Sequence, residues 1–218
     1  MTPEFASLVN PTFNYVLNLV DRIERGEQVS LERERQSIRN ELEDADVTAA
    51  NPDHPVRIEE FRLAKQALIY WVDEVMIEAD RDWQDYLLER EYFDSRDAAW
   101  KFYVDGELRA RRSSPDVIET WYLALVLGFQ GDIKDAFKSH LNQPLPGGSN
   151  DENEARTAWA ADLARQIRQT QIPDLAGEPF RGDVSLLHGK ALLQVAAACL
   201  GLSALAFCVL LYFWLKSA

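Results

Sequence analysis

Hydrophobic residues recur with the spacing of α-helices along most of this chain. No segment shows the sustained alternation of apolar and polar positions that a half-buried strand requires. Proline, glycine and capping residues divide the pattern into separate segments. The predicted helices cover residues 4–25, 31–46, 57–80, 82–93, 95–111, 115–127 and 154–171. The pattern therefore predicts an all-α domain, a helical bundle.

The last hydrophobic segment differs from the others, because residues 191–215 contain no charged side chain over 25 positions. As a helix rising about 1.5 Å per residue, it would extend about 37 Å, enough to cross a hydrocarbon core of about 30 Å. Lys190 and Lys216 flank it, and the aromatic residues 212–214 lie where an interfacial belt is expected. We predict a single C-terminal transmembrane helix, a tail anchor.

The topology follows from the two ends of the chain. The N-terminal sequence Met-Thr-Pro-Glu-Phe-Ala-Ser lacks the basic and apolar regions of a secretory signal. A short tail is easily translocated, whereas a large acidic domain is not, so we expect the N-terminal domain to be cytoplasmic. The expected parts are a cytoplasmic helical bundle, a juxtamembrane linker, the anchor and a short tail beyond the membrane, at residues 1–172, 173–187, 188–215 and 216–218.

Charge is concentrated in the part before the anchor. Residues 188–218 hold two of the 23 basic residues and none of the 36 acidic ones, so 21 basic against 36 acidic residues give the rest about −15. Such a surface repels nucleic acid and suits basic protein partners. Both cysteines, Cys199 and Cys208, lie in the anchor, so no disulfide or thiolate metal site is expected before it.

One predicted helix carries apolar residues that a single buried stripe does not explain. Within residues 57–80, Tyr70 and Ile77 lie opposite the main stripe, and Asp73 and Glu74 flank them. A helix that is apolar on two sides either packs on two sides or lines a groove. The acid pair is thus a candidate for the edge of a partner-binding cleft; exposed or ion-paired surface acids are the alternative.

A second hypothesis is a tail-anchored enzyme that uses Asp73 or Glu74 as an acid or base. Neighbouring helical side chains point about 100° apart, so a catalytic carboxylate would need a partner that the sequence does not identify. His54, His140 and His188 stand singly, without metal-ligand spacing. We therefore expect no metal, no cofactor and no enzymatic activity.

The segment Trp121–Phe129 is apolar on every side over nine residues, too short to span a membrane. This pattern predicts a helix buried all round at the centre of the core, with Leu125 among its buried residues. Gly128 and Gly131 then form a turn rather than a phosphate cradle, because a helix precedes them and no lysine with a hydroxyl residue follows.

Small residues form one face of the predicted anchor. Ala197, Gly201, Ala204 and Cys208 recur at i, i+4, i+7 and i+11. Such a face lets two helices approach closely, so these positions are candidates for self-association in the membrane. Ordinary lipid contact is the alternative, since small residues are common in membrane spans.

Two motifs together resemble a known family. Ala-Leu-Ile-Tyr-Trp-Val-Asp-Glu (67–74) is followed by Trp83 and by Trp-Tyr-Leu-Ala-Leu-Val-Leu-Gly-Phe-Gln-Gly (121–131). The combination resembles the DotU/IcmH/TssL family, a tail-anchored inner-membrane component of bacterial type VI and related type IVb secretion systems. Residues 94–103 lack the glycine usually found before the family's paired aromatics. We also expect the peptidoglycan-binding domain that some members carry to be absent.

The resemblance implies a non-enzymatic scaffold in the bacterial inner membrane, with a short periplasmic tail. Its implied partners are an IcmF/TssM-like inner-membrane protein and a cytoplasmic baseplate component, and it is implied to dimerise through its anchor. Asp73 and Glu74, with Tyr70 and Ile77, would then lie in a cytoplasmic interaction cleft.

Overall fold

The computed structural model describes residues 1–171, and every regular element in that range is helical. The longer helices are α1 (Pro3–Glu24), α2 (Leu31–Ala49), α3 (Ile58–Ala79), α5 (Ala98–Leu108), α6 (Pro115–Val126) and α8 (Glu152–Gln171). The short elements are η1 (Arg81–Asp85), α4 (Leu88–Phe93), η2 (Ala110–Arg112), α7 (Ile133–Asp135), the π-turn η3 (Ala136–His140) and η4 (Pro146–Gly148). The predicted all-α fold is confirmed for this part of the chain.

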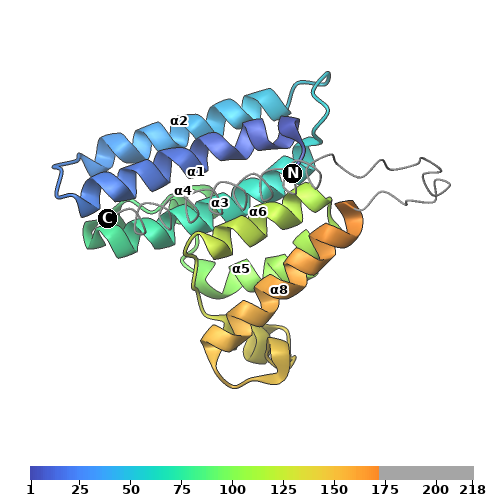
Figure 1. Ribbon diagram of the computed structural model, residues 1–218. Coiled ribbons are helices and arrows are strands. Elements are labelled where there is room, and N and C mark those ends of the chain that lie inside the picture. The colour runs from blue at the N-terminus through green and yellow to red at the C-terminus, as the bar shows by residue number, and fades with distance from the viewer. Residues whose placement is uncertain (172–218) are drawn as a thin grey trace, which may run out of the picture. The chain divides into compact units, whose positions relative to one another are not determined.

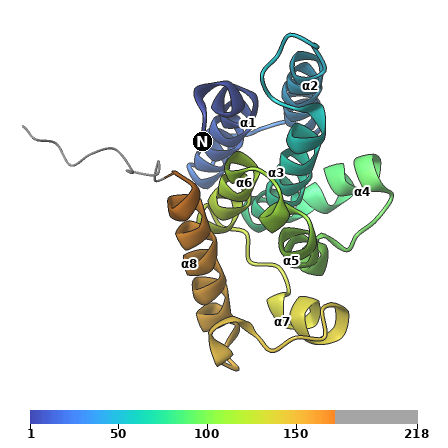
Figure 2. The ribbon, with the colours of Figure 1, turned by 90° about the vertical axis from the view of Figure 1, so that its right-hand side faces the viewer.

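Helix α3 is the central element. Helices α1 and α2 pack together against one side of α3, whereas α6 packs against the other side and α8 packs against α6 (Figures 1 and 2). α4 and α5 also contact α3. Because α3 has neighbours on several sides, 13 of its 22 residues are buried. This packing explains why apolar residues occur on opposite sides of α3 in the sequence.

Local signals fix the ends of several helices. The Thr2 hydroxyl accepts a hydrogen bond from Phe5 N at 3.4 Å and caps α1, and Pro3 occupies the first helical position. α6 likewise begins at Pro115. α6 ends before Gly128, whose φ of +116° lies in a region that residues other than glycine rarely adopt.

Aromatic side chains fill the core between α5, α6 and α8. Phe102 stacks on Phe129 with ring centroids 4.0 Å apart, and Trp121 and Trp159 are fully buried beside them. Gly106 makes this packing possible, because a Cβ atom there would lie 2.8 Å from the Trp159 ring. The absence of a side chain at Gly106 therefore allows α8 to pack closely against α5.

Two predicted helices are shorter or divided. The segment 82–93 was expected as one helix, but it forms η1 and α4, because the chain turns at Tyr86 and Leu87. The predicted helix 95–111 begins only at Ala98, and after Leu108 the chain continues as η2. Polar side chains hold both of these connections, as described below.

The prediction that Trp121–Phe129 is buried on every side is wrong. Trp121, Ala124 and Phe129 are buried, but Leu125 is only half-buried and Val126 is 57% exposed. The apolar pattern therefore does not reflect a helix enclosed on all sides. Part of α6 is instead open to solvent along its contact with α8.

Within residues 1–171, no helix is both long and apolar enough to cross a bilayer. The predicted linker and anchor begin at residue 173, so they lie outside the described residues. The same holds for the predicted self-association face, Ala197, Gly201, Ala204 and Cys208.

Candidate functional site

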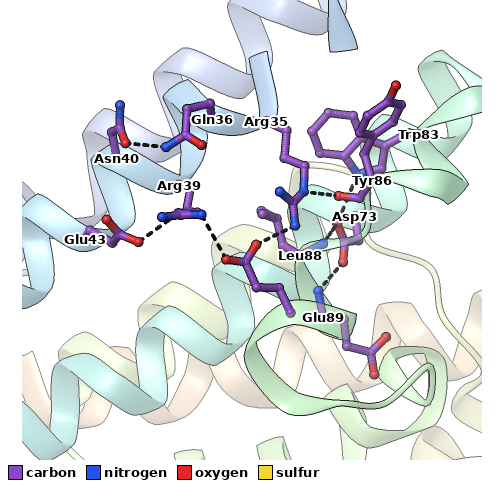
Figure 3. A network of polar contacts seen from close by, with 11 residues as sticks. Arg35, Gln36, Arg39, Asn40, Glu43, Asp73, Trp83, Tyr86, Leu88 and Glu89 are labelled. Carbon is purple, nitrogen blue, oxygen red and sulfur yellow. Dashed lines mark hydrogen bonds and ion pairs between the residues drawn. The ribbon is translucent and has the colours of Figure 1, made fainter. Parts of the chain in front are cut away.

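The carboxylate of Asp73, on α3, accepts hydrogen bonds from the backbone at the start of α4 and from the indole ring of Trp83 in η1. One oxygen accepts hydrogen bonds from Trp83 Nε1 at 3.0 Å and Leu88 N at 2.9 Å, and the other accepts from Glu89 N at 2.7 Å (Figure 3). The residue is only 3% exposed. A carboxylate with three N–H donors at its two oxygens is a structural anchor for the backbone that it binds.

Helix α2 holds the same segment from a second direction. Arg35 Nε donates to the carbonyl oxygen of Tyr86 at 2.8 Å (Figure 3). The same guanidinium forms an ion pair with Glu91. Arg39 Nη1 also pairs with Glu91, at 3.2 Å. Residues 81–93, which we call the clamped segment, are therefore fixed to both α2 and α3.

A second buried carboxylate continues this arrangement. Glu89, on α4, donates its backbone N–H to Asp73 and is itself only 3% exposed. Its Oε1 accepts hydrogen bonds from Ser95 Oγ at 2.5 Å and from Asp97 N at 2.8 Å. Asp97 precedes α5, so two buried acids in succession link α3 to α4 and α4 to the start of α5.

Glu74, the next residue on α3, binds a different loop. Its Oε1 accepts hydrogen bonds from Gln130 N at 2.7 Å and Gly131 N at 2.8 Å. Trp71 Nε1 donates to the Leu127 carbonyl oxygen at 3.1 Å. The two sequence motifs, 67–74 and 121–131, are thus in direct contact, and α3 fixes the turn that follows α6.

This turn depends on Gly131. Its φ of +54° is a left-handed conformation, and a Cβ atom there would lie 2.4 Å from the Ala99 carbonyl oxygen. Asp132 N donates to the same oxygen at 2.7 Å, and the Tyr103 hydroxyl donates to the Gln130 carbonyl. The Gly-Phe-Gln-Gly turn is therefore bound by α5 as well as by α3.

The electrostatics follow from burial. Burial raises the pKa of Asp73 to about 6, although its three N–H donors favour the carboxylate. Burial also raises the pKa of Glu74 above its ordinary range, against the two backbone N–H donors. Burial is again the main cause at Tyr70, whose pKa is about 12. The oxygens of both acids accept hydrogen bonds from N–H donors of the domain itself.

The residues predicted for the cleft occupy different positions. Tyr70 is 1% exposed beneath Phe93, with ring centroids 5.6 Å apart, and Ile77 is half-buried. Asp73 lies inside the domain rather than at a rim, and Glu74 faces the turn beyond α6. The four residues therefore do not share an open cleft edge. Partner binding through them stays a prediction.

Two open grooves follow the contact between α6 and α8. The larger, of about 350 Å³, lies beside the Gly-Phe-Gln-Gly turn, where Val126 and Gln130 face Arg156 and Thr157. The second, of about 260 Å³, lies between Tyr122 on α6 and Ala164 and Arg168 on α8. Both grooves are open to solvent, and the larger one includes the exposed Val126 of α6.

Sequence reasoning missed the partners of the acid pair. Glu89 resembles a surface acid in the sequence, because it lies between Leu88 and Arg90 in a charged stretch. Arg35 and Glu91 similarly resemble solvated residues. The only usable signal was the shared presence of the Asp-Glu and Gly-Phe-Gln-Gly motifs, which does not reveal that one binds the other. In the described part of the chain, no cluster of histidine, cysteine or acidic residues has a metal-binding arrangement.

A search of curated proteins and a search of solved structures gave no match. The family model described as type VI secretion system protein DotU matches residues 4–217, nearly the whole chain and both contacting motifs. The chain belongs to the DotU family of type VI secretion system proteins.

Proposed function

We propose that this protein is a non-enzymatic scaffold of a bacterial type VI secretion membrane complex. In this proposal, residues 191–215 anchor it in the inner membrane and the helical domain lies in the cytoplasm. Membership of the DotU family supports the secretion role, and the uncharged 25-residue segment supports the anchor. The domain then joins an IcmF/TssM-like membrane protein to a component of the cytoplasmic baseplate.

The observation that carries this proposal is how Asp73 and Glu74 are used. Each carboxylate binds backbone N–H groups of one loop, so the pair determines the shape of two surfaces of the domain. An acid that fixes loops supports a docking role better than a catalytic one. The alternative, an enzyme that uses either residue as an acid or base, would need these hydrogen bonds to be released.

The clamped segment offers the acidic docking surface. Asp82 and Asp85 are exposed on η1, and Glu78 is exposed at the end of α3 just before it. Asp73 fixes this segment through the indole of Trp83, which lies between the two exposed acids. We place the contact with a basic surface of the cytoplasmic partner here, so Asp73 acts by positioning the exposed acids.

Self-association belongs to the anchor in this proposal. The small residues Ala197, Gly201, Ala204 and Cys208 would allow two anchors to pack closely, which gives a homodimer. The cytoplasmic domains are then presented in pairs to their partners.

Affinity purification of the detergent-extracted full chain tests the scaffold role. We expect a larger IcmF/TssM-like membrane protein and a baseplate component to co-purify. Asp82→Lys with Asp85→Lys should reduce recovery of the baseplate component at least tenfold, because like charges then meet across the contact. Recovery of the membrane partner should be unchanged.

The matched control is Glu32→Lys with Asp44→Lys, which makes the same charge change at exposed positions of α2. If both double variants retain the baseplate component, the docking surface lies elsewhere. If neither partner co-purifies with the parent protein, the scaffold role itself is wrong.

A further inference from the structure

The two halves of the described chain differ sharply in charge. Residues 1–97 contain 11 basic and 23 acidic side chains, whereas residues 98–171 contain 9 basic and 10 acidic ones. The acidic surface therefore belongs to α1–α4 and the segments between them. The part that contains α5, α6 and α8 is close to neutral, so it repels an anionic surface far less.

Within this neutral half, one end combines cations with an exposed apolar side chain. The Gln166 amide on α8 donates to the Arg111 carbonyl oxygen at 2.7 Å, and Arg111 lies 3.9 Å from Asp162 of α8. These contacts bring η2 against the last turns of α8. Leu108, which is 47% exposed at the end of α5, directly precedes the Arg109–Arg112 stretch.

The acids at this end form ion pairs with their neighbours. Asp105 pairs with Arg109 at 3.4 Å, Glu107 with Arg111 at 2.9 Å, and Asp162 with Arg165 at 3.0 Å. The remaining two acids, Asp116 and Glu119, share a single cation, the N-terminal amine, so one negative charge of this pair stays uncompensated. No salt bridge within residues 1–171 involves Arg112 or Arg168, and both side chains have exposed surface.

We infer that this end of the domain, formed by Leu108, Arg112 and Arg168, contacts the anionic lipid surface of the membrane. The inference rests on the proposed anchoring. The described chain ends at Gln171 on α8, and only residues 172–190 separate it from the uncharged segment. Tethering of this kind raises the effective concentration of the lipid surface, so a weak attraction suffices. Each basic residue near an anionic leaflet strengthens binding to the lipid surface about fivefold, and a neighbouring leucine adds apolar contact.

The test uses the full chain, with both cysteines replaced by alanine and an environment-sensitive dye at Gln169→Cys, an exposed position on the last turn of α8. The protein is reconstituted into vesicles of phosphatidylcholine alone or with about one third phosphatidylglycerol, each with a nitroxide-labelled lipid. Quenching of the dye by this lipid reports contact with the surface. We expect quenching several-fold stronger in the anionic vesicles, and its loss at high salt.

Arg112→Glu with Arg168→Glu should reduce the quenching to the level seen in neutral vesicles, whereas Arg112→Lys with Arg168→Lys should retain it. The matched control is Arg33→Glu with Arg90→Glu, two exposed positions among the acidic helices, which should leave quenching unchanged. Equal quenching in both vesicle types, or equal loss in the control, would overturn the lipid contact and point to a protein partner at this end.

Alkaline extraction of membranes that contain the parent protein tests the anchoring proposal separately from the lipid contact. If the protein is extracted, the anchoring proposal is wrong and the lipid contact falls with it. If the protein resists extraction but the dye is not quenched, only the lipid contact is wrong.

Discussion

Glu74 and Gly131 lie 57 positions apart in the chain, yet the carboxylate of the first accepts a hydrogen bond from the backbone N–H of the second at 2.8 Å. This contact joins the Asp-Glu motif of α3 to the Gly-Phe-Gln-Gly turn after α6. It gives a physical reason for both motifs to occur in one chain, because the acid needs the turn's N–H groups and the turn needs an acceptor for them.

Gly131→Ala should reduce the free energy of unfolding by about 2–4 kcal/mol, since the new Cβ would lie 2.4 Å from the Ala99 carbonyl oxygen in a left-handed backbone. Gly148→Ala is the control. It has a similar φ, +71°, but nothing within 4 Å, and should cost only about 1 kcal/mol. Denaturant unfolding of the two variants measures the difference. Equal losses of unfolding free energy would show that the domain accommodates the new Cβ atom beside the Ala99 carbonyl oxygen without extra cost.

Asp73→Asn should destabilise the domain by about 2–3 kcal/mol at acidic pH, because the NH2 group of an amide cannot accept a hydrogen bond, whereas both oxygens of a protonated carboxyl group still can. The raised pKa of Asp73, about 6, means that the folded state keeps a proton that the unfolded chain releases. The stability contributed by Asp73 is therefore greatest below about pH 4 and declines up to about pH 6, by up to about 3 kcal/mol. The cost of the substitution should shrink over this window.

Denaturant unfolding between pH 4 and pH 7 measures this dependence. Asp82→Asn, at an exposed position of the same segment, serves as the control and should have little effect at any pH. A constant cost of Asp73→Asn across the range would contradict the shifted titration.

Ala124→Asp should destabilise the domain by more than about 3 kcal/mol, because it buries an unpaired charge at a position that is 0% exposed. Leu125→Asp should cost less than about half as much, since Leu125 is half-buried and lines the open groove. Comparing the two melting temperatures checks the order. The reverse order would mean that the exposed part of α6 is covered in the native protein.

Arg35→Gln should loosen the clamped segment without unfolding the domain, because it removes the bond to the Tyr86 carbonyl and one ion pair with Glu91. Hydrogen exchange of residues 81–93 should accelerate at least fivefold while that of α3 stays slow. Arg33→Gln, two residues away on α2 but exposed, should leave exchange unchanged. Unchanged exchange in Arg35→Gln would show that Asp73 and the Arg39–Glu91 ion pair hold the segment without Arg35.

Replacing Ala197, Gly201 and Ala204 by leucine should weaken self-association in the membrane, because larger side chains keep two helices apart. Insertion should be unaffected, since leucine favours the bilayer. A reporter of anchor dimerisation measures the change, and an unchanged signal would exclude this face. A protease-sensitive tag after Ala218 should be cleaved only from the periplasmic side.

The long helices were predictable because their apolar spacing is regular and their ends carry proline, glycine or capping residues, as at Pro115 and Gly128. The division of residues 82–93 was not, because it depends on Asp73 binding the backbone at Leu88 and Glu89, a tertiary contact without a local signal. The sequence pattern identified the acid pair as unusual, but not its burial. Helical periodicity shows which side of α3 a residue occupies, not which loop covers that side.

Asp73 and Glu74 are adjacent on one turn of α3, and each restrains a different loop. A small rotation of this turn about the helix axis would move both restraints together, although the loops are more than forty residues apart in sequence. The clamped segment and the turn after α6 thus have a common mechanical support. A substitution that displaces this turn of α3 should therefore disturb both surfaces at once.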